Sequence, residues 1–101
     1  MPELLKKEEF RSIESKAKAL AKHTQKNICQ AQLQQFQSEC SQLKPRVFDN
    51  INYMLSELCV EVQSACGRVR DKQRKLDIVY QTLYKIESCG VEKDRSTISS
   101  K

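Results

Sequence analysis

The chain has 101 residues, of which 18 are basic and 13 acidic, so its formal net charge at pH 7 is +5. This length allows one domain. Two glycines and a single histidine exclude a glycine-rich phosphate loop and a histidine-based metal site. Hydrophobic residues make up 39% of the chain and charged residues 31%, which is typical of a polar globular protein and not of a disordered one.

Apolar side chains recur at alternating steps of four and three along most of the chain, the spacing of a helix that packs against other helices. Pro2 and Glu3 suit the first turn of a helix. The pattern becomes most regular between Cys29 and Leu43. We therefore predict a first long helix near residues 3–43.

Pro45 marks the main break in this pattern. A proline inside a helix costs about 3 kcal/mol, and its ring disfavours the helical conformation at Lys44. We predict a break near residues 41–46, formed either by a helical hairpin or by a kink in a continuous rod. A second long helix is expected near residues 46–89.

The second helix carries a wider apolar stripe, which is typical of a helix that contacts more than one neighbour. Gly67 interrupts it as a weak point, as a close-approach contact, or as a joint between two shorter helices. The sequence Cys89-Gly90-Val91 is typical of a helix end. We predict a single helical coiled-coil domain over residues 1–91 and a disordered tail over residues 92–101.

The predicted fold class is all-α, with two long helices, coiled-coil heptads, and a core completed by partner helices. Two isolated rods would bury too little apolar surface to offset the conformational entropy of ordering them. We therefore expect assembly with other helical coiled-coil proteins, as a hetero-oligomer or a homo-oligomer. The side chains predicted to contact partner helices are Cys29, Leu33, Phe36, Cys40, Leu43, Leu55, Leu58, Val62, Val69, Leu76, Tyr80 and Leu83.

A basic patch falls within eight residues of the second half. It consists of Arg68, Arg70, Lys72, Arg74 and Lys75. Three interpretations stay open: a solvated helix face, charges that select partner helices, and a contact with nucleic acid or an anionic membrane surface. No aromatic residues are interleaved with the patch to stack on bases.

Nothing in the sequence points to catalysis. The five cysteines, at positions 29, 40, 59, 66 and 89, lack zinc-binding or Cys-x-x-Cys spacing and are expected to be free thiols. A thiol enzyme would need His23, the only histidine, beside one of them. We predict no enzyme activity, no cofactor, no metal site and no small-molecule substrate.

The sequence also allows a prediction of the cellular compartment. No apolar run reaches the 18 residues typical of a membrane span, and the first nine residues include acids where a signal peptide is apolar. Free thiols suit a reducing environment. We predict a cytoplasmic protein, with a nuclear location as the alternative because the basic patch also suits a localisation signal.

The segment of residues 74–86, Arg-Lys-Leu-Asp-Ile-Val-Tyr-Gln-Thr-Leu-Tyr-Lys-Ile, resembles the segment for which the KxDL proteins are named. Lys75, Asp77 and Ile78 carry the resemblance, and Ile78 stands where the family has leucine. These proteins are small helical subunits of the BORC and BLOC-1 complexes. The resemblance implies a rod-shaped helical assembly at the cytosolic face of lysosomes, with no catalytic residue.

The sequence therefore predicts a non-enzymatic coiled-coil structural or adaptor subunit of a multiprotein complex, with lysosome or vesicle positioning as its process. The alternative is a basic helical protein that binds nucleic acid or chromatin, or that serves a kinetochore or meiotic-chromosome complex.

Overall fold

The computed structural model describes residues 2–24 and 30–92. This part of the chain is helical throughout its regular structure, so the prediction of an all-α protein is confirmed. The helices are α1 (Lys7–Lys22), α2 (Gln30–Leu43), the short 3-10 helix η1 (Lys44–Arg46), α3 (Asp49–Ala65) and α4 (Lys72–Gly90).

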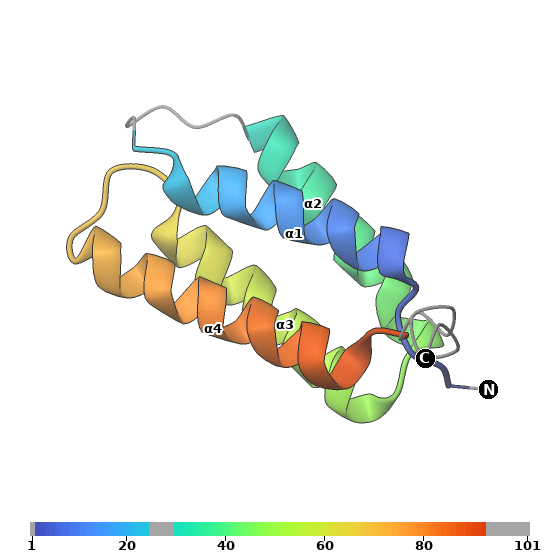
Figure 1. The fold of residues 1–101 in the computed structure, drawn as a ribbon. Coiled ribbons are helices and arrows are strands. Elements are labelled where there is room, and N and C mark those ends of the chain that lie inside the picture. The colour runs from blue at the N-terminus through green and yellow to red at the C-terminus, as the bar shows by residue number, and fades with distance from the viewer. Residues whose placement is uncertain (1, 25–29, 93–101) are drawn as a thin grey trace.

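The four α-helices form an antiparallel bundle, with successive helices running in opposite directions (Figure 1). Helices α1 and α3 each contact the three other α-helices. Within the described part of the chain, α2 and α4 do not contact each other. Helices α1 and α3 therefore meet across the centre of the bundle, and α2 and α4 lie on opposite sides of that contact.

Four helices stand where the sequence predicts two long ones, near residues 3–43 and 46–89. In the first half, α1 ends at Lys22, and the next residue has an extended backbone. In the second half, Gly67 has a φ of 88° and Asp71 a φ of 54°, which a right-handed helix does not contain. Gly67 thus lies in a joint between two shorter helices, one of the three interpretations of this residue.

The boundary between α2 and α3 lies at Pro45. This residue belongs to η1, inside the interval 41–46 where the sequence predicts a break. The side-chain amide of Asn52 donates a hydrogen bond to the backbone carbonyl of Lys44 (3.1 Å). The Val47 N–H donates to the same carbonyl (3.4 Å), so the Asn52 amide adds a second hydrogen bond that holds the turn to the first turn of α3.

One cluster of buried apolar side chains fills the bundle and draws on all four α-helices. Because each helix contributes a stripe at the four-three spacing, the stripes meet when the chain folds back on itself. The largest of the fully buried side chains are Phe10, Phe36, Leu5, Ile13, Ile51, Leu55, Leu58 and Ile86.

Lys72 closes the end of the bundle that carries the α3–α4 loop. Its ammonium group donates hydrogen bonds to the backbone carbonyls of His23, Ala65 and Gly67, the last at 2.8 Å. The Gly67 N–H donates to the His23 carbonyl as well (2.9 Å). A cation at the carboxyl ends of α1 and α3 is favourable, since those ends carry the negative pole of each helix.

The N-terminal segment crosses the opposite end of the bundle. The Leu5 N–H donates to the carbonyl of Gly90 (2.7 Å), and the Glu92 N–H donates to the carbonyl of Leu5 (2.8 Å). The Glu3 N–H donates to the carbonyl of Arg46 (2.9 Å). Residues 2–5 therefore join the start of α1 to the end of α4 and to η1.

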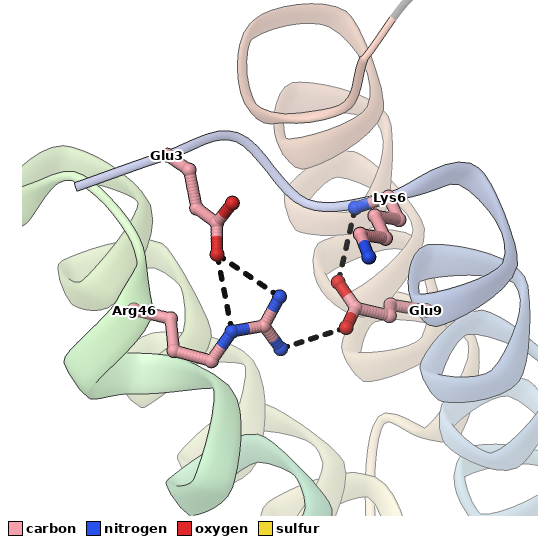
Figure 2. A network of polar contacts seen from close by, with 4 residues as sticks. All are labelled: Glu3, Lys6, Glu9 and Arg46. Carbon is pink, nitrogen blue, oxygen red and sulfur yellow. Dashed lines mark hydrogen bonds and ion pairs between the residues drawn. The ribbon is translucent and has the colours of Figure 1, made fainter. Parts of the chain in front are cut away.

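Arg46 fixes this segment through its side chain (Figure 2). Its guanidinium group lies 3.1 Å from the carboxylate of Glu3 and 2.7 Å from that of Glu9. The Lys6 N–H also donates to the Glu9 carboxylate (3.0 Å). Burial by itself raises the pKa of Glu9, but the hydrogen bonds from Arg46 and Lys6, together with the positive charge of Arg46, outweigh it and lower that pKa below its ordinary value of 4.5.

This network predicts an acid-sensitive contribution to stability. A carboxylate whose pKa is lowered by folding stabilises the protein above about pH 4.5, and that contribution is lost as the pH falls through the lower folded value. We expect Arg46→Met to lower the urea midpoint at pH 7, and the difference from the wild type to shrink steadily toward pH 3. An equal difference at both pH values would contradict the assignment.

Lys72 provides a second test of the fold. Replacing Lys72 with Met leaves the carbonyl oxygens at two helix ends without their charged donor, so we expect a loss of about 1 to 3 kcal/mol in the free energy of unfolding. The matched control is Arg74→Met, which removes an exposed charge from the same turn and should change stability by less than about 0.5 kcal/mol. Urea unfolding followed by circular dichroism measures both, and equal effects would show that Lys72 is not a structural residue.

Candidate docking surface

The side chains predicted to contact partner helices lie mainly inside the bundle. The set with at most 5% of their surface exposed consists of Leu33, Phe36, Cys40, Leu43, Leu55, Leu58, Val62 and Leu83. The half-buried members are Val69, Leu76 and Tyr80, and Cys29 lies outside the described residues. The chain's own helices thus bury the seam that the sequence analysis assigned to partner helices, because four short antiparallel helices cover one another and two rods do not.

A different set of apolar side chains faces outward on α3 and α4. Val60 is 68% exposed, Tyr53 65% and Ile78 40%. Val60 and Ile78 line one shallow groove of about 150 Å³ between the two helices, together with Glu61, Ser64 and Lys75. Tyr53 lies two helical turns before Val60, on the same face of α3.

Charged side chains flank this groove in two rows. Glu57 and Glu61 lie on α3, and Lys75 and Lys85 lie on α4. Among the residues that the structure describes, none of these four takes part in an ion pair within 4.0 Å. We call the two rows, the groove and Tyr53 the α3–α4 surface.

Local contacts hold the acidic row in place. The Thr82 hydroxyl donates to the Glu61 carboxylate across the two helices (2.5 Å). Burial raises the pKa of Glu61, and the hydrogen bond from Thr82 opposes that rise. A hydrogen bond to Glu57 raises the pKa of Tyr53. The Glu61 carboxylate is therefore positioned by a neighbouring hydroxyl group and not by a cation of the same chain.

The basic patch is divided between two environments. Arg68, Arg70 and Arg74 are exposed near the α3–α4 loop, and Lys75 is half-buried at the groove. Lys72 is bound to three backbone carbonyls. Its inclusion in the basic patch is therefore corrected, because its ammonium group serves the fold and not an external ligand.

A larger groove, of about 400 Å³, runs between α1 and α4. Its lining residues are Glu14, Lys18, Lys22, Tyr80, Leu83, Tyr84 and Glu87. The Lys18 ammonium lies 3.3 Å from the Glu14 carboxylate and 5.8 Å from the centre of the Tyr80 ring. Because part of its charge is already paired within the chain, this groove is a weaker candidate for docking than the α3–α4 surface.

The described thiols differ from one another, since the hydrogen bond with Cys40 lowers the pKa of Cys59 below its ordinary value of 9.0. Cys40, Cys59, Cys66 and Cys89 are free. A hydrogen bond to Cys59, together with burial, raises the pKa of Cys40 well above its ordinary value of 9.0, and burial raises the pKa of Cys66. Since the thiolate is the reactive form, both side chains act as small packing residues.

Within residues 2–24 and 30–92, no group of three or more His, Cys, Asp or Glu side chains is arranged to hold a metal ion. None of the helices in the same part of the chain combines the length and the apolarity needed to cross a membrane.

Sequence reasoning missed the α3–α4 surface. The seam through Leu58 and Val62 leaves Val60 on the opposite side of α3, because two residues correspond to about 200° around a helix. A search for apolar residues outside the main stripe would have found Val60. Ile78 was noted only for its place in the segment that resembles the KxDL proteins.

Leu58 and Val60 form a matched pair that tests this assignment. Leu58 is fully buried and Val60 is 68% exposed on the same helix. We expect Leu58→Asp to cost about 4 kcal/mol or more, because it buries an unpaired charge, and Val60→Asp to cost about 0.5 kcal/mol. Thermal unfolding monitored by circular dichroism distinguishes them, and similar losses in the two variants would show that Val60 is also a core residue.

Comparisons with protein-family models, with curated proteins and with solved structures found no match for this chain.

Proposed function

We propose that the protein is a non-enzymatic structural or adaptor subunit that docks a helical protein chain on its α3–α4 surface. The observation that carries this proposal is the joint exposure of Val60 and Ile78 in one groove, beside charged side chains that lack ion-pair partners among the described residues.

The chemistry of the surface suits a helix laid along it. An amphipathic helix places apolar side chains at intervals of three and four, which fit a groove between two parallel or antiparallel helices. Covering a side chain as exposed as Val60 contributes about 1 to 2 kcal/mol. The acidic row on α3 and the basic row on α4 add orientation, because charges at the edge of an interface discriminate between partners more than they strengthen binding.

The proposed biological setting comes from the resemblance to the KxDL proteins. Lys75 and Ile78, two of the three residues that carry the resemblance, also line the groove. A surface that docks helices suits a subunit of an assembly such as BORC or BLOC-1. We therefore propose lysosome or vesicle positioning as the process, and the cytoplasm, at the cytosolic face of lysosomes, as the place of action.

A second candidate function is binding of an anionic partner, nucleic acid or chromatin, near the α3–α4 loop. Three exposed arginines, Arg68, Arg70 and Arg74, favour it. Such binding would weaken steeply with salt, since it releases counterions. A kinetochore or meiotic-chromosome subunit would fit this chemistry. We rank it second because the ammonium group of Lys72 binds backbone carbonyls of the same chain. The basic patch is therefore smaller than the sequence indicates.

The docking proposal predicts that charges introduced into the groove block assembly. Affinity purification of tagged protein from cells identifies the wild-type partners, and the binding of each partner to purified variants is then measured. We expect Val60→Asp and Ile78→Asp each to weaken binding at least tenfold, because a buried unpaired charge is costly.

The matched control is Tyr84→Asp, which alters a side chain that is 71% exposed on α4 but lines the other groove. It should leave binding unchanged. If Tyr84→Asp abolished binding and Val60→Asp did not, the docking site would lie between α1 and α4 and the proposal would be wrong.

A further inference from the structure

The α3–α4 surface has a charge pattern that is complementary to itself. One helix presents Glu57 and Glu61, and its neighbour presents Lys75 and Lys85. Burial raises the pKa of Glu61, and the positive charge of Lys85 opposes that rise only slightly; no ion pair forms between the two side chains within the described chain. The acidic row and the basic row therefore lie side by side, and their charges can still form ion pairs with another chain.

We infer that the chain docked on the α3–α4 surface is a second copy of this protein, related to the first by a two-fold axis parallel to the helices. The inference rests on the proposed docking function and names its partner. A two-fold interface uses the same patch on both copies, so that patch must complement itself.

The position of the axis follows from the charges. Rotation about an axis parallel to the helices, lying between the two copies, places α3 of one copy opposite α4 of the other, and acidic residues then face basic ones. Rotation about an axis perpendicular to the helices would place α3 opposite α3. The carboxylates of Glu57 and Glu61 would then face the carboxylates of the second copy, and like charges repel.

The contact between Glu61 and Thr82 sets the register. It places residues 61 and 82 at the same level of the bundle (2.5 Å). Because α3 and α4 are antiparallel, Glu57, about one turn before residue 61, lies level with Lys85, just under a turn after residue 82. An axis parallel to the helices preserves these levels. Glu57 of each copy therefore faces Lys85 of the other, around a centre formed by Val60 and Ile78.

The size of the surface can be compared with that of known stable interfaces. Helix α3 has 17 residues and is about 25 Å long. Two neighbouring helices of this length present roughly 500 Å² per copy, which is below the area of about 800 Å² per partner typical of stable complexes. The area is therefore that of a weak, concentration-dependent pairing.

Complementary charge reversals test the inference on the full chain. Sedimentation equilibrium of the wild type between about 5 and 500 µM should show a monomer–dimer equilibrium. Glu57→Lys and Lys85→Glu alone should each weaken dimerisation at least tenfold, because each creates two like-charge contacts per dimer. An equimolar mixture should recover wild-type association, because both 57–85 contacts in the mixed dimer then join opposite charges.

Several outcomes would overturn the inference: a wild type that stays monomeric throughout, single variants that dimerise like the wild type, or a mixture that associates no better than its components. Circular dichroism confirms that each variant is folded, and Glu57→Gln with Lys85→Gln, which remove the charges without reversing them, replace any variant that is not. A monomeric wild type whose other partners are lost on Val60→Asp would refute the second-copy inference and leave the docking function standing.

Discussion

The contact between α1 and α3 across the centre of the bundle determines which side chains are buried and which helix faces stay exposed. Only these two helices touch all the others within the described chain, and α1 meets its neighbours with two fully buried alanines, Ala17 and Ala21. Small side chains let helix axes approach closely. Because the centre is filled in this way, the apolar stripes of all four helices are covered without help from another chain, and the surfaces that remain for function are the outward faces.

Two charged residues at the ends of the bundle stabilise the fold through contacts within the chain. Lys72 binds carbonyls at the carboxyl ends of two helices, and Arg46 joins the N-terminal segment to η1 and α1. An excess of positive charge therefore does not translate directly into a binding surface for an anion. The charges on the α3–α4 surface are different, since no ion pair within the described residues satisfies them.

The helical class and the identity of the core residues could be read from the sequence, because burial imposes the four-three spacing on Leu55, Leu58 and Val62 whichever chain supplies the neighbouring helix. The number of helices could not. The apolar spacing continues through Gly67, although α3 ends at Ala65, where the backbone becomes extended at Cys66 and left-handed at Gly67. The α3–α4 surface was not predicted either, because the apolar stripe that drew attention passes through Leu58 and Val62, and Val60 lies on the other side of α3.

The N-terminal segment has a consequence for how the protein is joined to others. Leu5 exchanges backbone hydrogen bonds with Gly90 and Glu92, so both ends of the described bundle emerge at one pole, as Figure 1 shows. The α3–α4 loop lies at the opposite pole. Fluorophores or fusion domains attached beyond either end would thus crowd the same pole of the bundle, while the exposed arginines near the α3–α4 loop would stay accessible to solution.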